Sequence, residues 1–470
     1  MNSRQIFLIL LFGVGGAAHA QLRVATWNVT NYTSGRTDAF QTAIYGSFQG
    51  RQMAPDVIMG QEFRSSSAIT NFVNMLNSAA GSPNDWAAAP WVNHGDTSSA
   101  FFYRTSKIDF VGQSVVNGDP RLIGRYDIKF KGYEDSASSP IMALYSTHMK
   151  SGSSSDDQSR RLYEATAVRN DANSLPSNYS FMLGGDLNIQ TSTQAAYQKM
   201  VGSDSNNRGQ FYDPIKSPGN WNNNANYRFL HTQDPSGAGG MDDRFDQLLV
   251  SGDLTDGKGL DYIGDAHQAY SDSTWDDPNH SYRVWGNDGS SFNGQITTTG
   301  NTMVGGDIAQ ALIESTGNTN PNVTGGHLPV FLDLRMQGEI GASTSFLDFG
   351  NIRLGSDASR FLDIFNSVDA GIWGVNGVAA LNYTMEFSSG FFGSGDPFSD
   401  AAGGGVNNHQ IWADTSHLGL LSGFLTIRDV SGLTRTIGLS ANIVPVPEPA
   451  SLAALGLGAL ALLRKKKTTA

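Results

Sequence analysis

The feature that most constrains the fold is a pattern repeated along the first two thirds of the chain, in which a short apolar stretch ends in polar residues. In residues 181–190 two glycines end such a stretch, and Asp186 and Asn188 follow. If the strand direction persists, the alternation of side chains puts these two on one face. A carboxylate that orients water beside an amide that donates to phosphate suits hydrolysis. An ordinary turn after a strand uses the same residue types, so this stretch alone leaves both interpretations open.

Polar residues accompany the ends of the other predicted strands in the same way: Asn28, Glu62, His148, Asp246 and His327. Helical patterns at 66–80 and 156–173 alternate with these strands, and residues 100–111 predict a β-hairpin. Residues 201–240 and 256–326 are rich in glycine and asparagine and predict long loops around one strand. Strands that alternate with helices form sheets covered by helices, with sites at strand ends. We therefore expect the polar residues to meet in one site.

The length of 470 residues exceeds what one hydrophobic core usually serves, so we expect domains at 21–336 and 340–444. From residue 346 onward, short alternating strands separated by Gly, Ser and Asp predict an all-β sandwich. This second region resembles the Ig-like modules that often precede surface anchors. We expect it to act as a spacer or an adhesion module.

Charge and cysteine content exclude several function classes. The net charge of −12 argues against a protein that coats nucleic acid, although it leaves room for a local basic groove. The sequence has no cysteine, which excludes disulfides, thiolate metal sites and thiol catalysis. Stability must therefore come from the size of the core or from a bound metal.

The N-terminal residues predict export. Arg4 precedes an apolar run at 6–14, and Ala18-His19-Ala20 has the small-residue form of a signal-peptidase site. The run is too short to span a membrane. We expect residues 1–20 to be a signal peptide and the mature chain to start at Gln21.

The C-terminal residues 445–470 form a tripartite segment: Val446-Pro-Glu-Pro449, an apolar stretch at 450–463 and four basic residues at 464–467. The apolar stretch is marginal in length for a membrane span, and the cations would hold its end in the cytoplasm. A buried helix of the last domain is the alternative, against which the four consecutive cations argue. The segment resembles the PEP-CTERM sorting signal. That resemblance implies transient membrane insertion, removal by an exosortase-type enzyme and delivery to the periplasm, outer surface or extracellular matrix of a Gram-negative bacterium.

The order of the polar motifs resembles the endonuclease/exonuclease/phosphatase superfamily, also called deoxyribonuclease-I-like, over residues 22–334. The resemblance implies a four-layer α/β sandwich, in which helices flank two packed mixed sheets. It also implies a Mg²⁺-dependent phosphoester hydrolase, with Mn²⁺ or Ca²⁺ as alternative ions. The motifs that carry it are Thr26-Trp-Asn28, Gln61-Glu62, Ser146-Thr-His148, Gly185-Asp-Leu-Asn188, Asp243-Arg-Phe-Asp246 and Gly326-His-Leu-Pro-Val330.

The resemblance implies a role for each carboxylate and amide. Glu62 would bind the metal ion, and Asn28 would help to hold the ion or the phosphate. Asp186 would orient or deprotonate the attacking water, while Asn188 would donate to a nonbridging oxygen. Such a site fits the chemistry, because Mg²⁺ prefers oxygen ligands and a metal stabilises the charge that gathers on phosphorus.

The resemblance also implies roles for the histidines. His148 and His327 would contact the phosphate, and Asp246 would pair with one of them, His327 in the first instance. A carboxylate partner fixes the tautomer of a histidine and favours its charged form.

Basic residues are candidates for binding the substrate backbone. Arg64 stands two residues after Glu62, at the spacing of an arginine that contacts nucleic acid in deoxyribonuclease-like relatives. Arg104 and Lys150 are weaker candidates of the same kind. The alternative for Arg64 is an ordinary solvated surface arginine.

One departure from the superfamily pattern concerns the last histidine. The sequence has Gly325-Gly326-His327 where the family usually has Ser-Asp-His, so a carboxylate is missing. Its loss implies a changed metal count, slower turnover, loss of activity or a carboxylate supplied from elsewhere. The candidates for that carboxylate are Asp242, Asp243 and Asp307.

The leading hypothesis is an exported Mg²⁺-dependent phosphodiesterase, namely a nuclease that cleaves extracellular DNA or RNA. The acidic balance weakens the nucleic-acid part, since binding to a phosphate backbone draws on cations. One rival is a phosphatase or phosphodiesterase acting on lipid headgroups or small phosphoesters. A second rival, motivated by Gly326, is a catalytically silent matrix protein that only binds.

Overall fold

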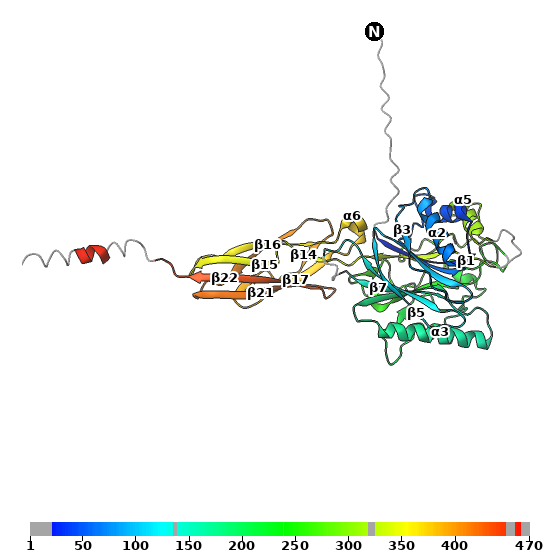
Figure 1. Ribbon diagram of the computed structural model, residues 1–470, viewed down its shortest axis with the longest axis horizontal. Helices are drawn as coiled ribbons and strands as arrows, with labels where there is room; N and C mark the ends of the chain where they lie inside the picture. The colour runs from blue at the N-terminus through cyan, green and yellow to red at the C-terminus, as the bar shows by residue number, and fades with distance from the viewer. Residues whose placement is uncertain (1–20, 135–138, 238, 318–324, 448–455, 462–470) are drawn as a thin grey trace, which may run out of the picture. The chain divides into compact units, whose positions relative to one another are not determined.

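The structure is a computed structural model that describes residues 21–134, 139–237, 239–317, 325–447 and 456–461. The predicted signal peptide and most of the predicted sorting segment lie outside the described residues. The chain divides into two compact units (Figure 1). The first extends through Gly338 and also includes residues 368–379, and the second contains residues 339–367 and the chain from Ala380 onward.

The first sheet of the first unit has seven strands, six of them in the order β11-β13-β1-β2-β4-β3, with β12 paired to β13. β1 is parallel to β2 and antiparallel to β13, so the sheet is mixed. The strands are β1 Leu22–Tyr32, β2 Val57–Phe63, β3 Trp86–Ala88, β4 Ser98–Arg104, β11 Asp261–Tyr262, β12 Arg283–Val284 and β13 Val330–Arg335.

The second sheet of this unit runs in the order β5-β6-β7-β8-β10-β9. Its strands are β5 Ile108–Val116, β6 Ile123–Phe130, β7 Ile141–His148, β8 Tyr179–Asp186, β9 Phe211–Tyr212 and β10 Asp246–Ser251. The predicted hairpin at 100–111 is wrong, because β4 belongs to the first sheet and β5 to the second. A turn after an apolar strand looks the same whether the chain folds back or crosses to another sheet. Here β4 finds its partners in β2 and β3.

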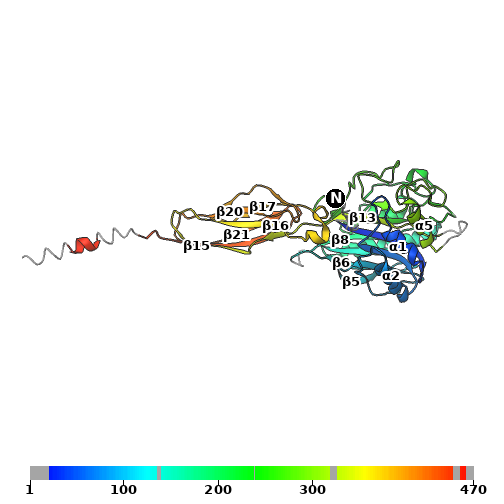
Figure 2. The ribbon, with the colours of Figure 1, turned by 90° about the horizontal axis from the view of Figure 1, so that it is seen from above.

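Helices cover both outer faces of the paired sheets. In Figure 1, α2 and α5 lie above the sheets and α3 lies below them, and Figure 2 shows α1 beside α2 on the upper side. This order of helix, sheet, sheet and helix is an α/β sandwich with mixed sheets. The helices are α1 Thr37–Tyr45, α2 Ser66–Ser78, α3 Ser155–Ser174, α4 Ala195–Val201 and α5 Gly305–Ser315.

Local sequence explains where the two predicted helices begin. The side chain of Ser65 accepts a hydrogen bond from Ala68 N at the start of α2, and Ser154 and Asp157 form a reciprocal capping box at the start of α3. α5 falls in a stretch predicted to be loop. Its buried face includes Ile308 and Leu312, four residues apart as helical packing requires.

The two sheets approach closely just before the end of β8. A Cβ at Gly184 would clash with the end of the Met59 side chain of β2, so a larger residue at this position would require Met59 to move. Beside this contact, Gln61 Nε2 donates to Ser146 Oγ at 3.0 Å, which joins β2 to β7 by a buried hydrogen bond. The sheets are thereby fixed against each other directly beneath the strand ends that carry the predicted site.

The second unit consists of two sheets, ordered β14-β16-β20-β18 and β15-β22-β21-β17-β19, around an apolar core that includes Leu362, Ile411 and Ile437. These strands agree with the predicted β structure after residue 346, while the likeness to Ig-like modules stays a prediction. The strands are β14 Ile340–Ala342, β15 Phe346–Arg353, β16 Ser359–Asn366, β17 Leu381–Phe387, β18 Phe391–Gly393, β19 Phe398–Asp400, β20 Asn407–Ala413, β21 Gly419–Asp429 and β22 Thr434–Val444.

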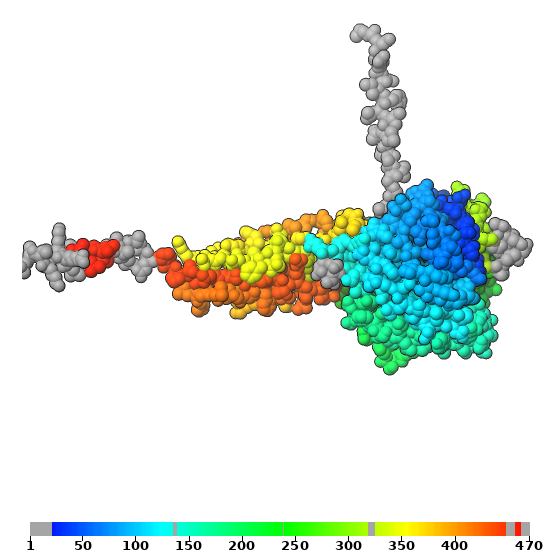
Figure 3. Space-filling view, viewed as in Figure 1, coloured from blue at the N-terminus to red at the C-terminus, as the bar shows by residue number. Residues whose placement is uncertain are grey.

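The predicted continuous domain at 340–444 is interrupted. Residues 368–379, with the short helix α6 Ala370–Trp373, pack within the first unit. Trp373 is fully buried there, and its Nε1 donates to Lys131 O at 2.8 Å. The face of the first unit visible in Figure 3 comes mainly from its N-terminal segments, coloured blue to cyan.

Candidate active site

Three strands of the second sheet place His148, Asp186 and Asp246 in one row. β7 and β8 are parallel with His148 opposite Asp186, and β8 and β10 are antiparallel with Asp186 opposite Asp246. Paired residues of neighbouring strands carry their side chains on the same face, so these three emerge side by side. Strand register therefore assembles half of the site.

The two glycines before Asp186 do not end β8, which continues through them to Asp186. A Cβ at Gly185 would lie 1.9 Å from Thr147 O of the neighbouring strand, so a side chain is excluded there by close backbone approach. The predicted turn at these glycines is corrected accordingly. Their function in the fold is to let β8 pack tightly while it delivers Asp186.

The first sheet contributes Asn28 and Glu62. Glu62 stands next to the end of β2, whereas β1 continues past Asn28 to Tyr32, with a register shift after Asn28. Asn28 Nδ2 donates to Glu62 Oε1 at 3.0 Å and to Asp186 Oδ2 at 3.2 Å, and so links the two sheets. Glu62 has a φ of +66°, in the left-handed region that a glutamate rarely adopts, and the β2–β4 pairing shifts register there. Strained residues and bulges of this kind concentrate at functional sites.

Asp186 lies at the centre of the cluster. Its Oδ1 accepts from Asn188 N at 3.1 Å, and its Oδ2 lies 3.4 Å from His148 Nε2 and 3.6 Å from His327 Nε2. Burial raises the pKa of Asp186 above its ordinary value, although the two histidines oppose the rise. A buried carboxylate with a raised pKa, surrounded by proton donors, is equipped to take a proton from water.

His327 is held by two carboxylates. Asp246 Oδ2 lies 2.7 Å from His327 Nδ1, which is the pairing that the superfamily resemblance implies. Burial works to lower the pKa of His327, but Asp246 and Asp186 outweigh burial and raise it to about 10. The imidazole therefore carries a positive charge at neutral pH.

His148 behaves in the opposite way. It lies 3.7 Å from Glu62 Oε1 through Nδ1, and burial lowers its pKa despite the attraction of Asp186. Glu62 is the most open carboxylate of the cluster, with 15% of its side chain exposed. Burial works to raise the pKa of Glu62, but His148 and the hydrogen bond from Asn28 lower it below its ordinary value.

The predicted phosphate donor Asn188 stands beside Asp186 with a left-handed φ of +52°. Its Nδ2 donates to Met149 O at 3.1 Å, which fixes the side chain against the loop after His148. Arg64 is exposed one residue beyond β2, and its Nη1 donates to Asp96 O at 2.8 Å.

The structure does not bring the other two basic candidates to the cluster. Arg104 lies at the end of β4 that pairs with Val57, whereas Glu62 lies at the other end of β2. Its guanidinium is bound by Asp85 and lies 3.7 Å from Asp56. Lys150 Nζ is paired with Asp157 at 2.8 Å. Both cations are engaged in structural ion pairs.

Two supporting residues were missed by the sequence patterns. Arg121 Nη1 donates to His148 O at 3.2 Å and holds the end of β7. Thr232 Oγ1 accepts from Asp246 N at 3.0 Å and so supports the partner of His327. Both come from irregular segments, where periodicity carries no signal.

The side chains of the cluster meet the needs of a Mg²⁺ ion only in part. Among the residues that the structure describes, no group of three or more His, Asp or Glu side chains is arranged to hold a metal ion. Mg²⁺ commonly keeps several waters and takes one or two carboxylates. Glu62, partly open and ionised, fits as a single protein carboxylate for such an ion, with Asn28 fixing its position.

Comparison with known proteins identifies one segment of the chain. Residues 445–467 match the family model of the PEP-CTERM protein-sorting motif. The chain carries a PEP-CTERM sorting motif. This confirms the resemblance noted in the sequence, and the motif implies export to the surface of a Gram-negative cell and processing by an exosortase. No curated protein matches the sequence.

Several solved structures resemble the chain at low identity. A humanized D. rerio TDP2 is 12% identical with a TM-score of 0.38, covering 67% of this chain and all of that one. The human Nocturnin catalytic domain is 13% identical with a TM-score of 0.37, covering 67% and 94%. An endonuclease/exonuclease/phosphatase from Beutenbergia cavernae is 14% identical with a TM-score of 0.34, covering 89% and 100%. At these scores the likenesses carry no functional argument, and function is inferred from the site geometry.

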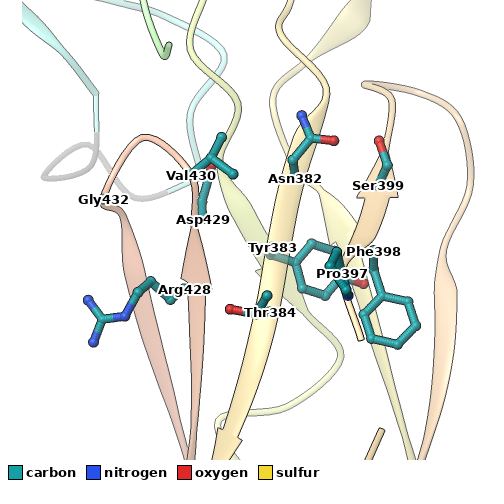
Figure 4. Close-up of a pocket in the computed structure, with 10 residues that line it drawn as sticks. All are labelled: Asn382, Tyr383, Thr384, Pro397, Phe398, Ser399, Arg428, Asp429, Val430 and Gly432. Atoms are coloured by element: carbon teal, nitrogen blue, oxygen red, sulfur yellow. The ribbon is translucent and has the colours of Figure 1, made fainter. Parts of the chain in front are cut away.

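Among the described residues no helix is long and apolar enough to cross a membrane. Most of the apolar stretch at 450–463, for which the sequence predicts transient insertion, lies outside the described residues. A cavity of about 580 Å³ lies in the second unit, lined by Tyr383, Phe398 and Arg428 among others (Figure 4). It contains none of the predicted site residues.

Proposed function

We propose that the protein is an exported, Mg²⁺-dependent phosphodiester hydrolase that cleaves extracellular nucleic acid. The observation that carries the proposal is the position of Asp186, a buried carboxylate with a raised pKa, within 3.6 Å of both His148 and His327. Hydrolysis at phosphorus needs a base for water, a positive charge for the phosphate and a fixed geometry for both. Residues of this cluster meet each need.

The chain's own residues divide the work. Asp186 orients a water molecule and accepts its proton. His327, charged and held by Asp246, binds a nonbridging phosphate oxygen, and Asn188 directs a second donor to the same group. His148, with a lowered pKa, supplies a neutral N–H donor beside Asp186.

Glu62 is proposed as the metal ligand, with Asn28 holding its carboxylate in place. The ion, when bound, would supply Lewis-acid stabilisation of the charge that develops on the phosphate. Glu62 suits this role because it is the most open carboxylate of the cluster and its pKa lies below its ordinary value.

The substrate class is proposed to be nucleic acid, with Arg64 as its exposed backbone contact. Lipid headgroups and small phosphoesters are the rival substrates, since Arg104 and Lys150 are held in ion pairs and a net charge of −12 gives little general affinity for a polyanion. The PEP-CTERM motif implies delivery to the cell surface, where extracellular polymers would be available as substrates.

The test is a plasmid-nicking assay on purified mature protein, with Mg²⁺ and with EDTA, beside a panel of lipid and inositol phosphates. We expect nicking that needs Mg²⁺ and that is abolished by Asp186→Ala. Asp307→Asn, which removes an exposed carboxylate on α5, is the matched control and should retain full activity. Cleavage of the phosphate panel alone would replace the nuclease by the rival esterase, and nicking that survives EDTA would overturn the metal mechanism.

The binding-only alternative has its own outcome in this assay. A protein that binds without catalysis would hydrolyse nothing in either arm, and Asp186→Ala would leave every measured property unchanged.

A further inference from the structure

Position 326 cannot hold the carboxylate that the superfamily pattern places there. Gly326 has a φ of +95°, and a Cβ on it would lie 2.4 Å from Thr316 Cγ2. Thr316 itself is fixed, because its Oγ1 donates to Ile313 O at 2.7 Å at the end of α5. A side chain at 326 would require this helix end to move, so glycine is demanded by both conformation and space.

A different carboxylate reaches the same turn from another part of the chain. Residues 232–234 run antiparallel to the segment before β13, with Gln233 bridged to His327. Asp234 N donates to Gly326 O at 3.0 Å, and Asp234 Oδ1 accepts from Gly325 N. The backbone and the side chain of Asp234 therefore both hold the turn that presents His327.

Asp234 is built as a functional residue rather than as an ordinary loop residue. It is 6% exposed and has a left-handed φ of +62°. Burial raises its pKa, and the nearby charge of His327 lowers it, so the two groups are within electrostatic reach. A buried carboxylate in a strained backbone conformation is costly to maintain, and such cost is usually tolerated where function requires it.

The candidates named from the sequence fit less well. Asp307 is exposed in the first turn of α5. Asp243 Oδ1 accepts from Asn222 Nδ2 at 2.8 Å. Burial, and then the charge of Asp243, raise the pKa of Asp242 to about 6. Within the part of the chain that the structure describes, none of these three forms a hydrogen bond or an ion pair with the Gly325–His327 turn. Asp234 lay in a loop-like stretch of sequence and gave no signal.

We infer that Asp234 replaces the carboxylate missing at position 326 and acts as a positioning residue for His327, which it fixes in place and supports with its negative charge. This inference rests on the proposed hydrolase function, in which His327 binds the phosphate. Asp246 pairs with Nδ1 of the imidazole. Asp234 holds the backbone segment that carries His327.

The test separates the charge of Asp234 from its hydrogen bond. Asp234→Asn keeps an oxygen acceptor for Gly325 N and tolerates a left-handed φ, so it removes only the charge. Asp234→Ala removes both, and Asp307→Asn is the control for loss of an acidic residue. We expect kcat for plasmid nicking to fall about tenfold in Asp234→Asn with KM within about twofold, further in Asp234→Ala, and not at all in the control.

A second readout does not depend on activity. The ring of His327 is followed by NMR in histidine-labelled protein, with His327→Gln to assign its signal. Loss of the Asp234 charge should lower the pKa of His327 by about half a unit to one unit in Asp234→Asn.

The outcomes are distinct. Unchanged kcat and unchanged His327 pKa in Asp234→Asn, together with a folded protein by thermal unfolding, would overturn the inference and leave Asp234 as a backbone anchor. A wild-type protein without any hydrolysis would overturn the proposed function, while the NMR arm would still decide whether Asp234 supports His327.

Discussion

Two carboxylates of the cluster, Glu62 and Asp186, share a hydrogen-bond partner but lie in different environments. Both accept a hydrogen bond from Asn28. Glu62 is partly open and its pKa lies below the ordinary value, while Asp186 is 2% exposed and its pKa lies above it. Chemically similar groups are thus prepared for opposite tasks, because one stays ionised for a cation and the other can hold a proton.

The largest expected effect comes from Asp186→Asn, which keeps the size of the side chain and removes the base. We expect kcat to fall by about 10²–10⁴-fold, in the range of a lost general base. Raising the Mg²⁺ concentration should not restore it. Activity restored by Mg²⁺ would mean that Asp186 acts as a ligand, and the contrast with Glu62 would fail.

Glu62→Gln should behave differently. The substitution removes the charge proposed to hold the ion, so the Mg²⁺ concentration at half-maximal activity should rise about tenfold or more. Saturating Mg²⁺ should then recover most of kcat. A titration of activity against Mg²⁺ in both variants measures the difference, and identical curves for the two would show that the carboxylates share one role.

His327 should make stability depend on pH. The pKa of His327 is raised in the folded protein to about 10 from an ordinary 6.5. Its contribution to the free energy of unfolding is therefore fully present below pH 6.5 and is lost as the pH rises through 10. Thermal unfolding of the wild type should therefore show a falling Tm across that interval. His327→Gln should flatten the decline, and an unchanged slope in this variant would assign the decline to other groups.

The smallest expected effect is on KM, and it should differ between Arg64 and Arg104, the two arginines that the sequence predicts as substrate contacts. Arg64→Gln should raise KM for nucleic acid by about 1.4–5-fold, as for one exposed charge contact worth ~0.2–1 kcal/mol. Arg104→Gln should leave KM unchanged and lower the Tm instead, because Arg104 pairs with Asp85 at the far end of β4. Equal KM effects would show that substrate extends over both ends of the sheet.

The half of the site that strand geometry determines could be predicted from the sequence. His148 and Asp186 follow apolar stretches and Asp246 precedes one, a pattern that is visible without coordinates. The register of the three strands brings these residues into one row. The pairing of β4 with β2 was not visible, because an apolar strand followed by a turn does not specify its partner. Arg104 was assigned to the site for that reason.

The parts that escaped prediction depend on contacts between distant, irregular segments. α5 has the spacing of a helix, but the glycine- and asparagine-rich sequence around it concealed the pattern. Asp234 acts through a backbone pairing with residues some ninety positions away. In the sequence Gly326 marks a missing carboxylate, whereas in the fold it meets a steric demand set by Thr316.

The return of residues 368–379 to the first unit has a practical consequence for where the chain is cut. A fragment ending at residue 336, where the sequence predicts the end of the first domain, would lack α6 and the buried Trp373. The ring of Trp373 lies 6.1 Å from that of Phe130 and 5.1 Å from Lys107 Nζ, and removal of a buried tryptophan typically costs ~3–5 kcal/mol. The first unit is therefore discontinuous along the chain, and an intact fragment of it must extend past Ala379.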